Sequence, residues 1–137
     1  MLLAVSACSA PSLGDIERDW NGPRCGDNLW GQPQSPPDPA PYRAAHDCVV
    51  DAIQADQPFL LTWTRAYVDT GNNFALEYLS GALTFYAEYY VAAPSGKKTP
   101  TSIHACSTLV DYGVCSNYYD TVCVACGCDP PDPDCSP

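Results

Sequence analysis

The densest chemical feature of the sequence is a group of five cysteines near its end. Cys115, Cys123, Cys126, Cys128 and Cys135 leave seven, two, one and six residues between successive members. A C-x-x-C pair can present two thiolates to a tetrahedral zinc ion, or act as a redox pair where it opens a helix. The one-residue spacing is too short for a usual zinc knuckle, and no helix or βαβ pattern adjoins the C-x-x-C pair. The sequence therefore favours a disulfide-rich tail, with a zinc-binding module as the alternative.

Few other residues have the spacing of a catalytic or ligand motif. His46 and His104 are single histidines far apart in the sequence, and lone histidines are more often surface or structural residues. Asp129, Asp132 and Asp134 are interrupted by prolines and do not have calcium-loop spacing. No nucleophile elbow, phosphate-binding loop, dinucleotide-binding glycine motif or H-E-x-x-H motif occurs. We therefore expect a non-enzymatic protein with no cofactor and no metal site, the alternative being an exported enzyme whose site has no sequence signature.

The N-terminus carries a short pattern of its own, V-S-A-C, from Val5 to Cys8. It resembles the lipobox of bacterial lipoproteins, in which the signal peptide is cut before a cysteine that is then lipidated. The resemblance implies that residues 1–7 are a signal peptide remnant and that Cys8 anchors the protein to a membrane. Ser9 then implies sorting to the bacterial outer membrane or the cell surface. A secretory signal has a basic start and an apolar stretch of about 7–15 residues, so we expect the complete signal to begin upstream of Met1.

The number of cysteines agrees with this resemblance. Nine cysteines in 137 residues is far above ordinary usage and is typical of exported, disulfide-stabilised proteins. With Cys8 lipidated, an even number remains for disulfides. We expect Cys48 to pair with Cys106, and the tail cysteines to pair mostly with one another, one of them with Cys25. The full set of disulfide candidates is Cys25, Cys48, Cys106, Cys115, Cys123, Cys126, Cys128 and Cys135.

Charge and hydropathy limit the partners. The formal net charge is −10, from sixteen acidic and six basic residues, which disfavours binding to nucleic acid phosphates. No run of 18 apolar residues is present, so the sequence predicts no transmembrane helix. We expect contact with a membrane through the lipid anchor alone, and binding to cell-envelope protein or glycan.

The organising stretch of the chain runs from Pro58 to Ala92. Three runs in it alternate between aromatic or aliphatic and smaller or polar residues, separated by D-T-G-N-N and by Ser80-Gly81. A period of two predicts strands, and the short turn-rich links predict an antiparallel meander. Before it, Pro41–Ala55 carries an apolar stripe at helical spacing, and after it Thr99–Cys106 predicts a fourth strand at an edge, because of Pro100. The predicted fold is α+β, one helix packed on a four-stranded antiparallel sheet.

The expected domain plan follows from these elements. Residues 8–40 are rich in proline and glycine and predict a tether with an N-terminal segment. Residues 41–137 predict one α+β domain whose cysteine-rich tail begins at about residue 106. Since indoles are costly to leave in water, we expect part of Asp19–Trp30 to fold back onto the domain through Cys25. The spacer proper is then Ser9–Arg18 and Gly31–Asp38.

The alternation also predicts a partner surface. If Leu83 and Phe85 face the helix, Tyr86, Glu88 and Tyr90 face away from it, and the threonines of the first strand join them. An outward row of tyrosines beside hydroxyl groups suits a polar partner, with Tyr86 and Tyr90 at its centre. The alternatives are that these residues are ordinary strand formers, or that the Trp20–Trp30 segment covers them as a second small core.

Overall fold

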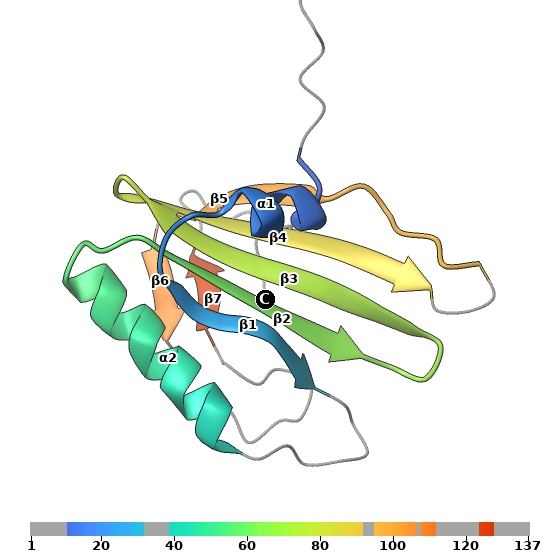
Figure 1. The fold of residues 1–137 in the computed structure, drawn as a ribbon, viewed down its shortest axis with the longest axis horizontal. Helices are drawn as coiled ribbons and strands as arrows, with labels where there is room; N and C mark the ends of the chain where they lie inside the picture. Colours follow the sequence, from blue (N-terminus) through green and yellow to red (C-terminus); the bar gives the residue numbers. More distant parts are fainter. Residues whose placement is uncertain (1–10, 32–38, 92–94, 107, 112–123, 128–137) are drawn as a thin grey trace, which may run out of the picture.

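The computed structural model describes residues 11–31, 39–91, 95–106, 108–111 and 124–127. Its main feature is a five-stranded sheet in the order β1-β2-β3-β4-β5, with a separate two-stranded sheet formed by β6 and β7. Figure 1 shows helix α2 running beside β1, and helix α1 lying over β3 and β4. The elements are α1 Leu13–Asp19, β1 Arg24–Gly31, α2 Pro39–Gln54, β2 Phe59–Ala66, β3 Thr70–Leu79, β4 Ala82–Val91, β5 Ser102–Cys106, β6 Thr108–Asp111 and β7 Val124–Gly127.

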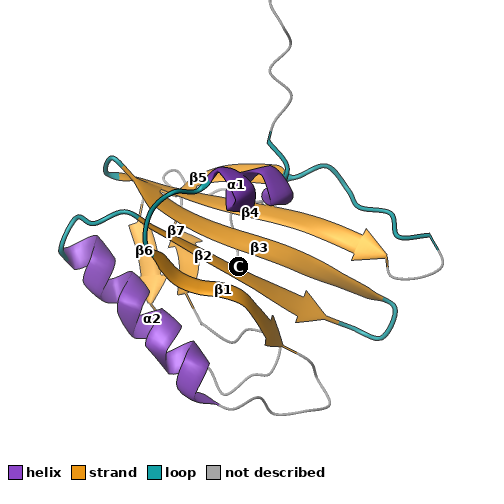
Figure 2. Ribbon diagram, viewed as in Figure 1, coloured by secondary structure: helices purple, strands orange, loops and turns teal. Residues whose placement is uncertain are grey.

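The α+β class and the central meander are confirmed. β2, β3 and β4 pair antiparallel along their whole lengths (Figure 2). Ser80 and Gly81 both have positive φ, 53° and 77°, as a two-residue hairpin turn that follows the strand twist requires. The other link is shorter than D-T-G-N-N suggests, since β3 already begins at Thr70. Gly71 lies inside the strand because the ring of Tyr90 crosses it so closely that a Cβ atom would clash.

The prediction of four antiparallel strands was wrong, because the sheet has a fifth strand and is mixed. β1 pairs parallel with β2, and α2 makes the connection between the two strands. Parallel neighbours need such a crossover. The register of β1 against β2 shifts twice, between Arg24 and Gly26 and between Gly26 and Leu29. These irregularities remove the alternation that would have marked β1 as a strand in the sequence.

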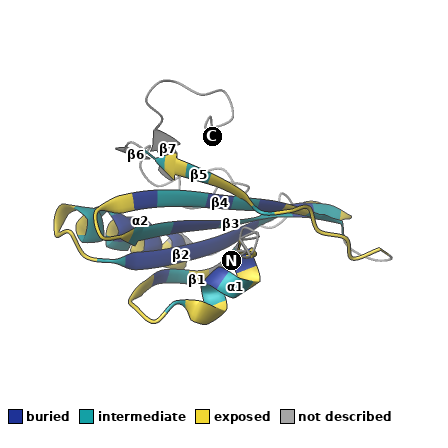
Figure 3. Cartoon of the chain, turned by 90° about the horizontal axis from the view of Figure 1, so that it is seen from above, coloured by how far each residue is buried: buried dark blue, intermediate teal, exposed yellow. Residues whose placement is uncertain are grey.

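α2 covers one face of the sheet, as the apolar stripe predicts. It begins two residues earlier than expected and ends one residue earlier, at Pro39 and Gln54. Ala45 and Val49 are 1% and 0% exposed and belong to the main core cluster with Phe59 and Leu61 of β2. Figure 3 shows that β2 is buried along most of its length, because the sheet is covered on both sides there.

The predicted pairing of Cys48 with Cys106 was wrong, and so was that of Cys25 with a tail cysteine. Cys48 of α2 forms a disulfide with Cys25 of β1, across a Cα–Cα distance of 5.4 Å. α2 lies against β1 at one edge of the sheet, whereas Cys106 is in β5 at the other edge. Cys106 is itself disulfide-bonded. The fold-back of the Cys25 segment onto the domain through this cysteine, however, was expected from the sequence.

α1 occupies part of the segment expected to be spacer. It packs on the face of the sheet opposite α2, where Leu13 and Ile16 join Leu60, Ala75 and Tyr86 in a second core cluster. Leu60 and Leu61 are adjacent in β2 and therefore point to opposite faces, so the two helices lie on opposite sides of the sheet.

Candidate functional site

Three polar side chains form a row across the sheet on the face that α1 covers. Thr64 of β2 is paired in register with Asn73 of β3, and Asn73 with Glu88 of β4. Directly paired residues on one sheet face are close enough for their side chains to bond. Thr64 and Glu88 are only 8% and 7% exposed, so this row is a polar strip inside the protein.

The hydrogen bonds of this row have a fixed direction. A carboxylate can only accept, so the Asn73 amide nitrogen donates to Glu88 Oε1, at 2.8 Å. The Asn73 carbonyl oxygen then accepts from the Thr64 hydroxyl, also at 2.8 Å. The protons of Thr64 and of one Asn73 N–H are therefore engaged within the row, and the Thr64 oxygen and the Glu88 carboxylate still offer lone pairs.

Lys98 brings a positive charge to the end of the row. Its Nζ lies 3.6 Å from Glu88 Oε1, and its side chain is 62% exposed. The segment that carries it runs beside the end of β4, where Tyr90 and Lys98 form an isolated bridge. The Asn73 amide and the Lys98 ammonium thus both approach the same oxygen of Glu88.

A pocket of about 180 Å³ opens at this row, between the sheet and α1. We call it the Glu88 pocket. A buried carboxylate, a second carboxylate, hydroxyl groups, an amide and an ammonium line it. Its full lining is Leu13, Gly14, Glu17, Thr62, Trp63, Thr64, Asn73, Phe74, Glu88 and Lys98.

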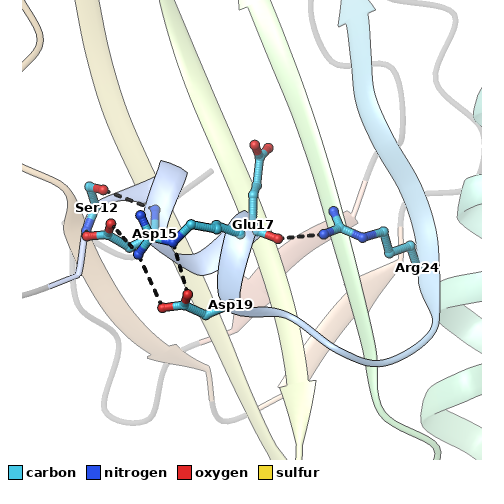
Figure 4. Close-up of polar contacts among 6 residues, drawn as sticks. Ser12, Asp15, Glu17, Asp19 and Arg24 are labelled. Atoms are coloured by element: carbon cyan, nitrogen blue, oxygen red, sulfur yellow. Dashed lines mark hydrogen bonds and ion pairs between the residues drawn. The ribbon is translucent and has the colours of Figure 1, made fainter.

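α1 forms the roof of this pocket and is held in place by polar contacts at both ends (Figure 4). Its first turn is a capping box, in which the Ser12 hydroxyl accepts from the Asp15 N–H while Asp15 accepts from the Ser12 N–H, each at 3.1 Å. These bonds from Ser12, with the nearby Arg18 guanidinium, lower the pKa of Asp15. Beyond the middle of the helix, the Arg24 guanidinium of β1 donates to the Glu17 carbonyl oxygen at 2.6 Å. A helix of seven residues needs such tertiary support, because short helices are marginal alone.

Tyr86 and Tyr90, the predicted partner surface, differ in their surroundings. Tyr86 is 8% exposed and packs under α1 with Leu13 and Ile16. Its hydroxyl donates to Glu77 Oε1 at 3.3 Å. Tyr90 is half-buried, with its ring over Gly71. The sequence pattern placed both residues on the correct face, but α1 covers Tyr86, and the Glu88 pocket opens at the polar row beside it.

The hydroxyl group of Tyr86 is expected to lose its proton only at high pH. Burial raises its pKa to about 12, and the charge of Glu77 and the hydrogen bond to it act in the same direction. Because the folded-state pKa lies above the unfolded-state value of about 10, this tyrosine contributes stability that is complete below about pH 10 and is lost as the pH rises toward 12. A pH titration followed by tyrosinate absorbance should show one tyrosine that ionises near pH 12 in the folded wild type. The same titration of folded Tyr86→Phe should lack that step. When both proteins are unfolded in urea, the tyrosine missing from the variant should ionise near pH 10, the ordinary value. If the folded proteins differ near pH 10 and not near pH 12, Tyr86 is not buried as described.

The other residues singled out in the sequence are not part of this pocket. His46 lies on α2, with Nδ1 3.1 Å from Asp47 Oδ1, and His104 lies in β5 beside the ring of Phe85. Cys8 and the side chains of the five tail cysteines fall outside the described residues, as does the acidic tail. Among the described residues, no group of three or more His, Cys, Asp or Glu is placed to hold a metal ion.

Sequence reasoning missed Glu17, Asn73 and Lys98. Asn73 looked like part of a turn, because asparagine and glycine dominate turns. Glu17 and Lys98 come from segments that looked like spacer and loop. The one available signal was Ser12-x-x-Asp15, a capping-box pattern that marks the start of α1.

Among the helices that the structure describes, none is long and apolar enough to cross a lipid bilayer. Comparison of the chain with protein-family models, with curated proteins and with solved structures gave no match.

Proposed function

We propose that this protein is an exported, lipid-anchored, disulfide-stabilised domain of the bacterial cell envelope with a binding role and no enzymatic activity. Cys8 carries the anchor, and the described domain presents the Glu88 pocket to its surroundings at the outer membrane or cell surface. The observation that supports export most directly is the Cys25–Cys48 disulfide, which joins a strand to a helix within the main core. Structural disulfides form and persist in oxidising compartments.

The binding role is supported by the composition of the pocket. Ligand sites are concave and combine apolar surface with a few converging polar groups. The Glu88 pocket has this character, with Leu13 of α1 on one side and the polar row of the sheet on the other. The Asn73 hydrogen bond and the Lys98 ammonium compensate the burial of the Glu88 carboxylate, which is 7% exposed and gives the pocket lining a fixed negative group. These features lead us to propose a protein or glycan of the envelope as the source of the ligand.

The anchor is tested by fractionation. The gene, extended to any upstream start and expressed in a bacterial host, should place the wild-type protein in the membrane fraction, labelled by radioactive palmitate. Cys8→Ser should abolish the label and shift most of the protein to the soluble fraction, because a single cysteine carries the acyl chains. Ser9→Ala is the matched control and should remain labelled and membrane-bound. If Cys8→Ser leaves the membrane-bound share unchanged, the proposed anchor is wrong.

A further inference from the structure

We infer that the Glu88 pocket binds a protonated primary amine carried by a small ligand, with Glu88 as the group that receives it. This inference rests on the binding role proposed above and names its ligand class. The acceptors of the pocket, the cation already beside Glu88 and the size of the pocket support this inference.

The first step is the direction of the hydrogen bonds. Because Thr64 donates to Asn73 and Asn73 donates to Glu88, both bonds run toward the carboxylate. The Thr62 hydroxyl also lies within 3.5 Å of an acceptor, Asp27 Oδ1. The Thr64 oxygen and the Glu88 carboxylate still have lone pairs directed to the pocket lining, and Glu17 adds a second carboxylate. A lining rich in acceptors suits a ligand rich in N–H donors, and a primary ammonium has three of them.

The second step is that an ammonium group already approaches this carboxylate. Lys98 Nζ lies 3.6 Å from Glu88 Oε1, which is near enough for attraction but longer than a charge-assisted hydrogen bond of about 2.7–2.9 Å. The Lys98 side chain is 62% exposed and can move into solvent at little cost, whereas Glu88 is 7% exposed and cannot. An incoming amine would replace the Lys98 ammonium group beside Glu88, which is held only weakly.

The third step concerns the size of the pocket and the net charge of the protein. A pocket of about 180 Å³ is slightly larger than a protein cavity of about 150 Å³ that admits benzene. That space admits an alkylamine of a few carbons or one amino sugar residue. The formal net charge of −10 also draws cations toward the protein from a distance.

The test is an NMR titration of the full chain carrying Cys8→Ser, with its other cysteines oxidised, at pH 7 and low salt. The probes are propylamine and glucosamine, each compared with a neutral partner of similar shape, propanol and glucose. Both amines should shift the Asn73 side-chain amide and saturate, and the neutral partners should not. Whichever amine binds more tightly identifies an alkylamine or an amino sugar as the source. Tetramethylammonium, which has the charge but no N–H group, should bind at least tenfold more weakly than propylamine.

Three variants locate the binding. Glu88→Gln should weaken amine binding tenfold or more, since it removes the negative charge that makes the hydrogen bond from the amine charge-assisted. Glu77→Gln removes the same charge from the same sheet face, outside the pocket lining, and should change the affinity less than twofold. Lys98→Met removes the competing cation and should tighten binding at least threefold, a gain that misfolding cannot produce.

Several outcomes would overturn the inference. Equal losses in Glu88→Gln and Glu77→Gln would mean diffuse attraction by surface charge. Weaker amine binding in Lys98→Met would mean that Lys98 supports the site and does not compete with the amine, which contradicts the second step. Saturable binding of calcium in preference to either amine would make it a metal site. None of these results depends on where the protein lies in the cell, so a failed fractionation and a failed titration are distinguishable.

Discussion

Replacement of Phe59 by alanine is expected to lower the free energy of unfolding by about 3–5 kcal/mol, the usual cost of removing a large aromatic side chain from a core. Phe59 is 0% exposed and begins β2, where its ring lies 6.0 Å from that of Tyr78, measured between centroids. It belongs to the main cluster with Ala45 and Val49 of α2. The substitution therefore leaves a cavity between the sheet and α2 that neither can fill without moving. Urea unfolding followed by tryptophan fluorescence, with disulfides intact, measures the change.

Two further variants make this result specific. Leu79→Ala removes a side chain of the same sheet that is 49% exposed, and should change stability by less than about 1 kcal/mol. Phe59→Leu keeps most of the apolar volume and should cost clearly less than alanine. If Phe59→Ala unfolds at the same urea concentration as Leu79→Ala, the packing of α2 on the sheet is not as described.

The parts of the fold that sequence reasoning predicted correctly are those in which local pattern and tertiary packing agree. The alternation from Phe59 to Val91 determined the faces of three strands, because each strand has one face toward α2 and the other toward α1. The apolar stripe of α2 predicted its buried residues, since Ala45 and Val49 repeat at four residues and are fully covered. In these elements a shift by one residue would expose the core, so the pattern is strongly constrained.

The parts that were missed depend on contacts between distant segments. β1 has no alternation because its register against β2 shifts twice, and it also contacts α2, which follows it in the chain. α1 has seven residues with glycine at its second position, and it becomes stable only on the sheet. The Glu88 pocket was predictable in part, since the alternation placed Thr62, Thr64 and Glu88 on one face. Its other walls, from Glu17 and Lys98, follow from how α1 and the segment after β4 fold back.

Removal of the Cys25–Cys48 disulfide is the other change with a large expected effect. The bond closes a loop with a sequence separation of 23 residues, for which the chain-entropy model gives about 3 kcal/mol. The double variant Cys25→Ala and Cys48→Ala should lose that amount in urea unfolding. Alanine is the suitable replacement because Cys25 is 9% exposed, and a serine hydroxyl there would add a cost of its own.

The same double variant separates stability from binding. The disulfide lies in the cluster on the α2 side of the sheet, whereas the Glu88 pocket lies on the α1 side. We therefore expect the variant to bind propylamine with unchanged affinity while it remains folded, although it unfolds at lower urea. Non-reducing peptide mapping of the wild type should first show the Cys25–Cys48 link. A wild-type map that joins Cys48 to a tail cysteine, or a double variant as stable as the wild type, would contradict this account of how β1 and α2 are held together.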